Sequence, residues 1–316
     1  MGSLGQDTGR VAIITGGTSG IGLHLSRHLH AKGWRVALVG RRPDVGSRKA
    51  ALLDPTGETA VFEQCDVSSY SSQAAMFKSV WDRWGRLDLL IANAGRVDNG
   101  SWYNFGGRGA AVGDLPPEPD SSCTDTHLKA VMYGTRLATH FMRHNKPTPG
   151  GKIIATSSIL GIHSCPTFPE YAAAEAGVIQ WVRAAAPLLK LKENITINTV
   201  MMGPVITPVM PGFAEAFLPE QLVLPQTILR AYDVFIEDPE NQRTGEAVET
   251  AHDQVYWYDM PEPKNAKLAV RNMAVYEPWF TILHGEKSGV ENSLQGPPKG
   301  NAGEAGLVRE LGVGMD

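Results

Sequence analysis

A tyrosine and a glutamate lie four residues apart in the segment 169–182, which reads PEYAAAEAGVIQWV. The alanine-rich stretch after the first proline, with Val178 and Trp181 at helical spacing, predicts a helix. Side chains four residues apart lie on one face of a helix, one turn from each other. The phenol of Tyr171, which can give or take a proton, is therefore expected beside the carboxylate of Glu175, an arrangement suited to proton transfer.

The elements that would position this pair alternate along the chain. Short apolar runs predict strands at residues 10–15, 35–40, 60–64, 87–92, 152–157 and 195–200, and helical patterns span residues 21–32, 70–84, 124–144 and 171–190. Pro187 is expected to bend or end the last of these helices early. Strands buried on both faces and separated by helices predict an α/β fold of the Rossmann type, a doubly wound parallel sheet flanked by helices.

Three segments depart from this alternation. Residues 97–122 are rich in Gly, Pro and Asp, which predicts a long loop after the fourth strand. Residues 203–236 mix prolines with large apolar residues, which suggests a mobile apolar flap. Residues 285–316 are Gly-rich and lack periodicity, which predicts a loosely held tail. We therefore expect one domain over residues 1–258, followed by a C-terminal extension over residues 259–316.

The composition excludes several classes of protein. The chain has 316 residues, 42% of them hydrophobic, and a net charge of -4, which gives no electrostatic reason to expect nucleic acid as a partner. Its three cysteines have no paired spacing, no signal-type apolar segment follows the start, and no apolar run reaches membrane-spanning length. These features predict a cytoplasmic protein with no membrane partner.

Two histidine pairs have the spacing that can grip a metal ion on a helix. His24 pairs with His28, and His140 pairs with His144. Neither pair has a carboxylate or other third ligand placed with it in the sequence, and both helices need polar outer faces. No metal site is therefore predicted.

A glycine-rich segment, TGGTSGIG, directly follows the first predicted strand and runs into a helix. Glycines at these positions allow a tight turn and close approach of the backbone to a diphosphate, which the helix N-terminus would face. A plain structural turn is the alternative interpretation. The residues of this segment predicted to bind a dinucleotide are Gly16, Thr18, Ser19, Gly20, Ile21 and Gly22.

Two arginines stand at the end of the second strand, where an acidic residue would accept the hydroxyls of an adenosine ribose. Arg41 and Arg42 can instead bind a 2′-phosphate, because a guanidinium forms bidentate bonds with phosphate that a carboxylate would repel. NADP(H) is therefore predicted in preference to NAD(H). Solvation of one or both arginines is the alternative.

Several motifs occur in a fixed order: TGGTSGIG, then CDV at 65–67, NAG at 93–95, and Tyr171 thirteen residues after Ser158. With these motifs, residues 8–258 resemble the short-chain dehydrogenase/reductase family, and most closely its 15-hydroxyprostaglandin-dehydrogenase-like branch. The resemblance implies a homodimer or homotetramer paired through the helices at 124–144 and 171–190. It also implies further cofactor-binding positions at Asp66, Val67, Asn93, Ala94, Gly95, Gly203, Val205 and Thr207.

The resemblance also implies a catalytic set, from which this chain departs. In the family a serine polarises the substrate oxygen, a tyrosine exchanges a proton with it, and a lysine and an asparagine complete the proton relay. Ser158 and Tyr171 match, but Glu175 stands in place of the lysine and His127 in place of the asparagine. We hypothesise that Glu175 orients His127 and raises its pKa, so that the two form an acid/base pair. The alternatives are that Glu175 only binds ribose hydroxyls, that His127 is an ordinary polar helix residue, or that the site is not catalytic.

These observations predict an NADP(H)-dependent oxidoreductase that acts on a carbonyl or secondary alcohol, with an altered proton relay. An isomerase, dehydratase or cyclase on the same fold is the alternative, and a cofactor-binding protein without catalysis is a third. A specialised biosynthetic step would suit such a site. A bulky apolar or amphipathic substrate is suggested by Trp102, Tyr103, Phe105, Phe213, Phe217 and Leu222.

Overall fold

A single mixed sheet forms the centre of the computed structural model, which describes residues 8–209 and 212–296. Eight strands of this part of the chain follow the order β3-β2-β1-β4-β5-β6-β7-β8. They are β1 (Val11–Thr15), β2 (Arg35–Gly40), β3 (Ala60–Gln64), β4 (Leu89–Ala92), β5 (Gly151–Ser158), β6 (Ile195–Met202), β7 (Ala247–Ala251) and β8 (Gln254–Trp257). All neighbouring pairs are parallel except β7 and β8. The predicted fold class is confirmed.

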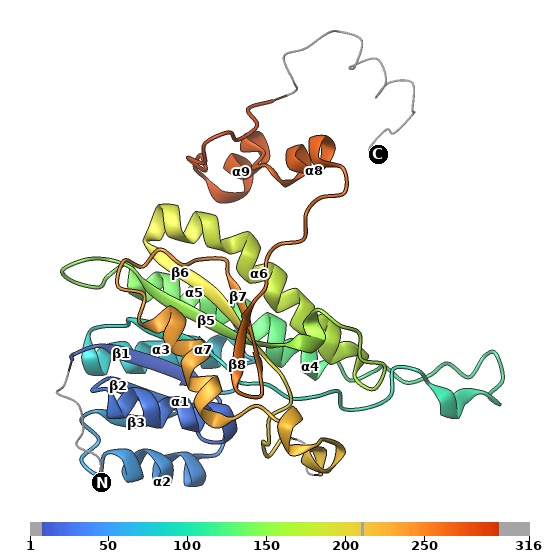
Figure 1. Ribbon diagram of the computed structural model, residues 1–316, viewed down its shortest axis with the longest axis horizontal. Coiled ribbons are helices and arrows are strands. Elements are labelled where there is room, and N and C mark those ends of the chain that lie inside the picture. Colours follow the sequence, from blue (N-terminus) through green and yellow to red (C-terminus); the bar gives the residue numbers. More distant parts are fainter. Residues whose placement is uncertain (1–7, 210–211, 297–316) are drawn as a thin grey trace. The chain divides into compact units, whose positions relative to one another are not determined.

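Helices cover both faces of the sheet (Figure 1). One face packs against α3 (Tyr70–Trp84), α5 (Ala130–Met142) and α6 (Pro169–Glu193), and the other against α1 (Gly20–Ala31), α2 (Pro43–Leu53) and α7 (Pro225–Ile236). Successive strand residues point to opposite faces, so Ile13 of β1 lies in the first core and Ile14 in the second. This burial on both sides explains why the strands read as continuous apolar runs.

The predicted strands and helices all occur, with ends shifted by a few residues, but further elements were missed, among them α2, β7 and β8. α2 buries only Gly46 and Ala50, so its apolar stripe is too small to show as a helical pattern. β7 and β8 are short, with five and four residues. The helix predicted at 124–144 is also not uniform: it consists of α4 (Ser122–Thr124), a π-helical turn η2 (Asp125–Lys129) and α5.

The predicted flap at 203–236 is too long, because its second half is a core helix. In α7 the side chains of Ile228, Tyr232 and Phe235 are buried against the sheet. The prolines made this segment look irregular in sequence, but Pro225 stands in the first turn of α7, where a missing N–H costs nothing. The segment between β6 and α7 thus ends at residue 224, and its described residues are 203–209 and 212–224.

Of the two outcomes expected at Pro187, a bend or an early end of the helix, the early end is wrong. α6 continues through this proline to Glu193. Proline removes one hydrogen bond of the helix, but Val182 and Ala186 before it are buried in the core, and Leu189 after it packs on the same core. Packing on both sides of the proline holds the helix together.

Residues from 260 onward form a separate compact unit. Its described part contains α8 (Ala266–Met273) and α9 (Glu277–His284). Residue Leu294 pairs with the start of α9, since its N–H donates to the Val275 carbonyl at 2.7 Å. Within the predicted loose tail, Leu294 is therefore bound to the segment that leads into α9. Residues 297–316 of the tail lie outside the described residues. Among the helices of the described ranges, none combines the length and apolar character needed to cross a membrane.

Candidate active site

The structure brings together the four residues predicted to be catalytic. Ser158 is the last residue of β5, and Tyr171 and Glu175 lie in the first two turns of α6. His127 comes from the π-helical turn η2. Ser158, Glu175 and His127 are 5%, 2% and 8% exposed. These three side chains are therefore shielded from water, which strengthens the electrostatic interactions among them, whereas Tyr171 is half-buried.

Glu175 and His127 form a buried pair. His127 Nδ1 lies 3.0 Å from Glu175 Oε1, and the His127 ring stands edge-on to the Tyr171 ring at 5.1 Å. Its other nitrogen, Nε2, lies 2.7 Å from the carbonyl oxygen and 2.9 Å from the amide nitrogen of Arg96. Burial alone would lower the pKa of His127, but the charge and hydrogen bond of Glu175 raise it. Protein groups thus contact both ring nitrogens of His127. Glu175 contacts His127 and lies one helical turn after Tyr171, so it connects the two residues.

The charge of Glu175 acts on the Tyr171 hydroxyl. Glu175 Oε2 is buried and accepts no hydrogen bond from the described part of the chain. Burial, and next the negative charge of Glu175, raise the pKa of Tyr171 well above its ordinary value, while the Ser158 hydroxyl opposes this shift. Tyr171 is therefore protonated at neutral pH, which suits it to donate a proton.

Gly95 makes the position of His127 possible. A Cβ atom on Gly95 would lie 2.4 Å from His127 Cε1, so any side chain there would displace the imidazole. The resemblance assigned Gly95 to the cofactor and the sheet, and its contact with His127 was not predicted. His127 reaches this position because it belongs to the π-helical turn η2, which inserts an extra residue into the helix.

The glycine-rich loop has the conformation that a diphosphate site needs. Gly16 and Gly20 have positive φ values of 66° and 49°. A Cβ atom on Gly22 would lie 2.3 Å from the Gly16 carbonyl oxygen, so the helix could not start this close to the strand with another residue. Thr207 lies over the loop, about 3.5 Å from where a Cβ of Gly20 would stand. These residues fit a dinucleotide whose diphosphate sits at the start of α1.

The remaining predicted cofactor residues divide into two groups. Asn93 and Ala94 lie beside the loop, where both N–H groups donate to Thr15 Oγ1 at 2.8 and 3.0 Å. Gly203 and Val205 instead face the sheet: the Gly203 N–H donates to the Thr250 carbonyl at 3.0 Å, and Val205 packs on the core. Both residues thus contribute to the packing of the sheet, and their role in cofactor binding stays a prediction.

The residues beyond the second and third strands lie near one another. Arg41 and Arg42 are exposed after β2, and Val67 is buried after β3. A hydrogen bond from Ser68 lowers the pKa of Asp66, and the charge of Arg41 adds to this. Arg41 is therefore close to Asp66, one of the predicted cofactor-binding residues. Thr18 of the glycine-rich loop also meets the end of β2, since its Oγ1 lies 3.0 Å from where a Cβ of Gly40 would stand.

The raised pKa of His127 predicts a pH-dependent stability. The folded state holds a proton that the unfolded chain loses above about pH 6.5, so this stabilisation is complete below that pH and is lost as pH rises through the folded-state pKa. A difference of one between the folded-state and unfolded-state pKa changes the free energy of unfolding by about 1.4 kcal/mol. We expect the free energy of unfolding of the wild type, relative to Glu175→Gln, to decline above about pH 6.5 in urea titrations. A free-energy difference that does not change with pH would contradict a protonated His127.

Comparison with known proteins identifies the family. The family model described as short chain dehydrogenase matches residues 10–216. Short-chain dehydrogenase/reductase prx6 of Penicillium rubens is 44% identical over 294 residues, which cover 90% of this chain and 97% of that protein. The 15-hydroxyprostaglandin dehydrogenase (NAD+) of Rattus norvegicus is 32% identical over 205 residues, covering 64% of this chain and 70% of that protein.

A solved structure shows the same fold. The crystal structure of a short-chain type dehydrogenase/reductase from Mycobacterium marinum matches with a TM-score of 0.67 and 22% identity, covering 78% of this chain and 96% of that chain. The sheet flanked by helices thus agrees with the sequence comparisons in fold. This chain therefore belongs to the short-chain dehydrogenase/reductase family, as an oxidoreductase of that type.

Proposed function

We propose that this protein is an NADP(H)-dependent reductase that converts a carbonyl group of a bulky apolar molecule to a secondary alcohol. The observation that carries the proposal is the buried His127–Glu175 pair beside Tyr171, with Nδ1 and Oε1 3.0 Å apart. The reductive direction is favoured because burial and the Glu175 charge raise the pKa of Tyr171, which disfavours the phenolate that oxidation would need as its base. Reduction needs the phenol instead, as a general acid.

The side chains then have separate roles. Ser158 donates a hydrogen bond that orients the substrate carbonyl oxygen, and Tyr171 donates its phenolic proton to that oxygen. The Glu175 carboxylate takes one proton from Nδ1 of protonated His127, and the neutral carboxyl group so formed gives that proton to the Tyr171 phenolate, so Glu175 ends as a carboxylate again. The net result is that His127 loses one proton and the substrate oxygen gains one. The reduced nicotinamide, when bound, supplies the hydride.

The preference for NADP(H) rests on Arg41 and Arg42 and gives a direct test. Each charged hydrogen bond to a phosphate is worth about 1.5–3 kcal/mol, so Arg41→Ala or Arg42→Ala should weaken NADPH binding by about 10-fold to 100-fold and leave NADH binding unchanged. Binding is followed by quenching of tryptophan fluorescence. Arg48→Ala is the matched control, because Arg48 is an exposed arginine of the adjacent helix α2. Equal loss for both dinucleotides, or tighter binding of NADH by the wild type, would favour NAD(H).

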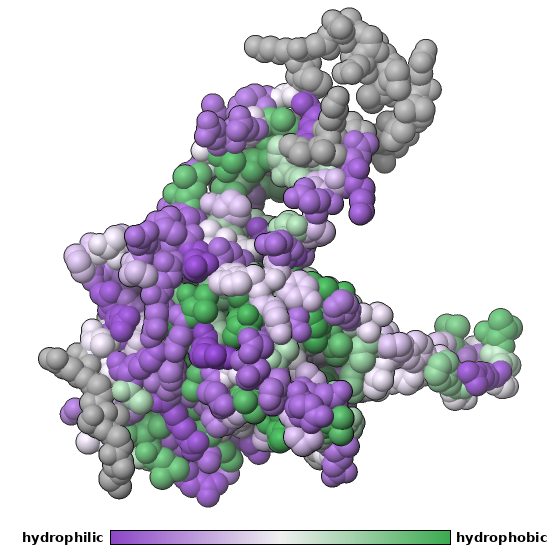
Figure 2. All heavy atoms as spheres, viewed as in Figure 1, coloured by the Kyte–Doolittle hydropathy of each residue, from purple (hydrophilic) through white to green (hydrophobic). Residues whose placement is uncertain are grey.

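The apolar substrate is supported by the loop between β4 and α4. Its aromatic residues Trp102, Tyr103 and Phe105 are 42%, 47% and 58% exposed. Trp102 donates to Glu170 at 3.4 Å, one residue before Tyr171, so this end of the loop lies close to the site. Figure 2 shows apolar side chains at the far end of a projecting part of the molecule. Within the loop, Val112 and Leu115 are also exposed. Of the predicted apolar flap residues, the side chain of Phe213 lies outside the described part of the structure.

Proton transfer without net oxidation is the second candidate, favoured by the hydrogen-bond capacity left at Glu175 Oε2. The two activities differ in what they do to the cofactor. With a panel of bulky apolar ketones, reduction consumes NADPH in a one-to-one ratio with alcohol formed, whereas isomerisation or dehydration changes the substrate and leaves NADPH absorbance constant. A protein that only binds the cofactor would be stabilised by it thermally and would change neither. Stoichiometric NADPH consumption is the expected result.

A further inference from the structure

The start of α6, the helix that carries Tyr171, needs hydrogen-bond partners from outside the helix. The first N–H groups of any helix lack partners within it. Pro169 at the first position has no N–H, and the Ala172 N–H donates to the Phe168 carbonyl at 3.0 Å. Phe168 is the N-cap residue, and its side chain makes no capping bond. The N–H groups that still need a partner are those of Glu170 and Tyr171.

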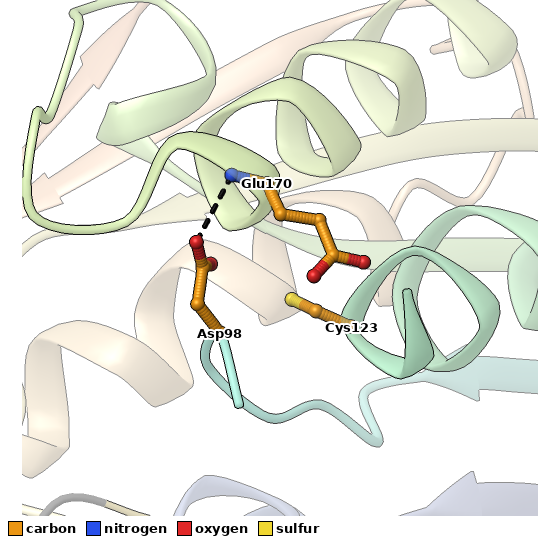
Figure 3. Close-up of side chains that lie close together, drawn as sticks. All are labelled: Asp98, Cys123 and Glu170. Carbon is orange, nitrogen blue, oxygen red and sulfur yellow. Dashed lines mark hydrogen bonds between the residues drawn. The ribbon is translucent and has the colours of Figure 1, made fainter. Parts of the chain in front are cut away.

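Asp98 supplies both partners from a distant part of the sequence. Its Oδ2 accepts from the Glu170 N–H at 3.1 Å, and its Oδ1 accepts from the Tyr171 N–H at 2.8 Å. Figure 3 shows the Asp98 carboxylate reaching the start of the helix, with the first of these bonds dashed. A carboxylate also interacts favourably with the positive end of the helix dipole. One side chain thus fixes the backbone from which the Tyr171 phenol extends.

The segment that presents Asp98 is held at its other end by the buried acid/base pair. We call residues 95–98 the strap. His127 Nε2 contacts both the carbonyl oxygen and the amide of Arg96, and Cys123 Sγ donates to the same carbonyl at 3.3 Å. The strap therefore runs from His127 to Tyr171. It connects the two ends of the proton relay without passing through the reacting atoms.

Glu170 provides a second link at the same place. Its Oε1 accepts from the Thr124 N–H at 2.8 Å, and its Oε2 accepts from Trp102 Nε1 at 3.4 Å. Ligand atoms of Asp98, Cys123 and Glu170 lie within 4.8 Å of one another, but the carboxylate oxygens are engaged in these hydrogen bonds. Burial raises the pKa of the Cys123 thiol to about 12, which keeps it protonated. The cluster in Figure 3 is thus a hydrogen-bonded joint between the strap, α4 and α6.

We propose that Asp98 is a positioning residue for Tyr171, and that it holds the phenol in register with Ser158 and the His127–Glu175 pair. The inference rests on the proposed role of Tyr171 as proton donor. Asp98 does not touch the reacting atoms; it acts through the first turn of α6. A displacement of about 1 Å in a catalytic group can cost about 100-fold in rate. The length and charge of Asp98 should therefore both matter.

Three variants test this role. Asp98→Asn removes the charge and one acceptor, whereas Asp98→Glu keeps both but lengthens the side chain by one methylene. Asp120→Asn is the matched control, because Asp120 belongs to the same loop and its carboxylate accepts from the Ser122 N–H at 2.8 Å. Each protein is labelled with carbon-13 at tyrosine Cζ, and the Tyr171 signal is assigned with Tyr171→Phe. The chemical shift of this signal, kcat, KM and the melting temperature are measured with NADPH and the best ketone of the panel.

Both Asp98 variants are expected to move the Tyr171 signal and lower kcat by about 10-fold or more, with KM for NADPH unchanged. Asp98→Glu should do so while keeping the melting temperature, because it retains a capping carboxylate. Asp120→Asn should change neither the signal nor kcat. An unmoved Tyr171 signal, or kcat within twofold of the wild type in Asp98→Glu, would overturn the proposal. If the wild type reduces no ketone, the proposed function fails and the Tyr171 signal alone decides the role of Asp98.

Discussion

Tyr171→Phe is expected to lower kcat for ketone reduction by about 10²–10⁴-fold, the usual contribution of a positioned general acid. The substitution removes only the hydroxyl and keeps the ring, so the edge-on contact with His127 at 5.1 Å is retained. Binding of NADPH should therefore be unchanged. Steady-state kinetics and a fluorescence titration on the same preparation measure the two effects.

The control for this change is Tyr133→Phe, in which a hydroxyl is removed from a tyrosine of α5 that packs on Tyr70. It should retain full activity. Activity of Tyr171→Phe within tenfold of the wild type would show that the proton comes from another group. The proposed order of transfer, from His127 through Glu175 to Tyr171, would then be wrong.

Glu175→Gln is expected to have the second large effect, a fall in kcat of at least about 100-fold. Glutamine has nearly the same shape but cannot pass a proton from His127 to Tyr171. It also removes the negative charge that raises the pKa of Tyr171, so this pKa should fall toward its ordinary value. The measurements are kcat as a function of pH and the pH titration of the labelled Tyr171 signal.

A matched control and a second variant separate the charge of Glu175 from its position. Glu193→Gln changes a glutamate at the far end of the same helix, which binds Arg143, and should have no effect on kcat. Glu175→Lys introduces the cation that the resemblance leads one to expect here, and it should reduce simple ketones better than Glu175→Gln. Unchanged turnover in Glu175→Gln would contradict the relay and would favour a role of Glu175 in binding ribose alone.

Local sequence was sufficient for much of the fold. The strands β1 to β6 could be predicted because they are largely buried and read as apolar runs, whereas the short β7 and the exposed β8 could not. The glycine-rich loop could be predicted because its backbone conformation and close packing demand glycine at fixed positions. α7 was mistaken for part of a flap, because a proline in a first helical turn looks the same in sequence as a proline that breaks structure.

For the catalytic site, too, one contact could be predicted from local sequence and another could not. The adjacency of Tyr171 and Glu175 follows from helical spacing alone, since residues four apart share a helix face. The contact between Glu175 and His127 joins residues 48 positions apart and depends on the π-helical turn and on the space left by Gly95. Helical periodicity could not predict it, because a π-turn changes the direction of every side chain that follows.

The role of Asp98 could be found only from the tertiary structure. In sequence it is one acidic residue of a polar loop, 73 positions from the Tyr171 N–H that it binds. The sequence alone determined the family, the parallel sheet, the dinucleotide loop and the unusual residue types at the active site, because these depend on short-range patterns. Only the tertiary structure decided which of those residues touch, because hydrogen bonds between distant segments form where the packing of helices on the sheet brings them together.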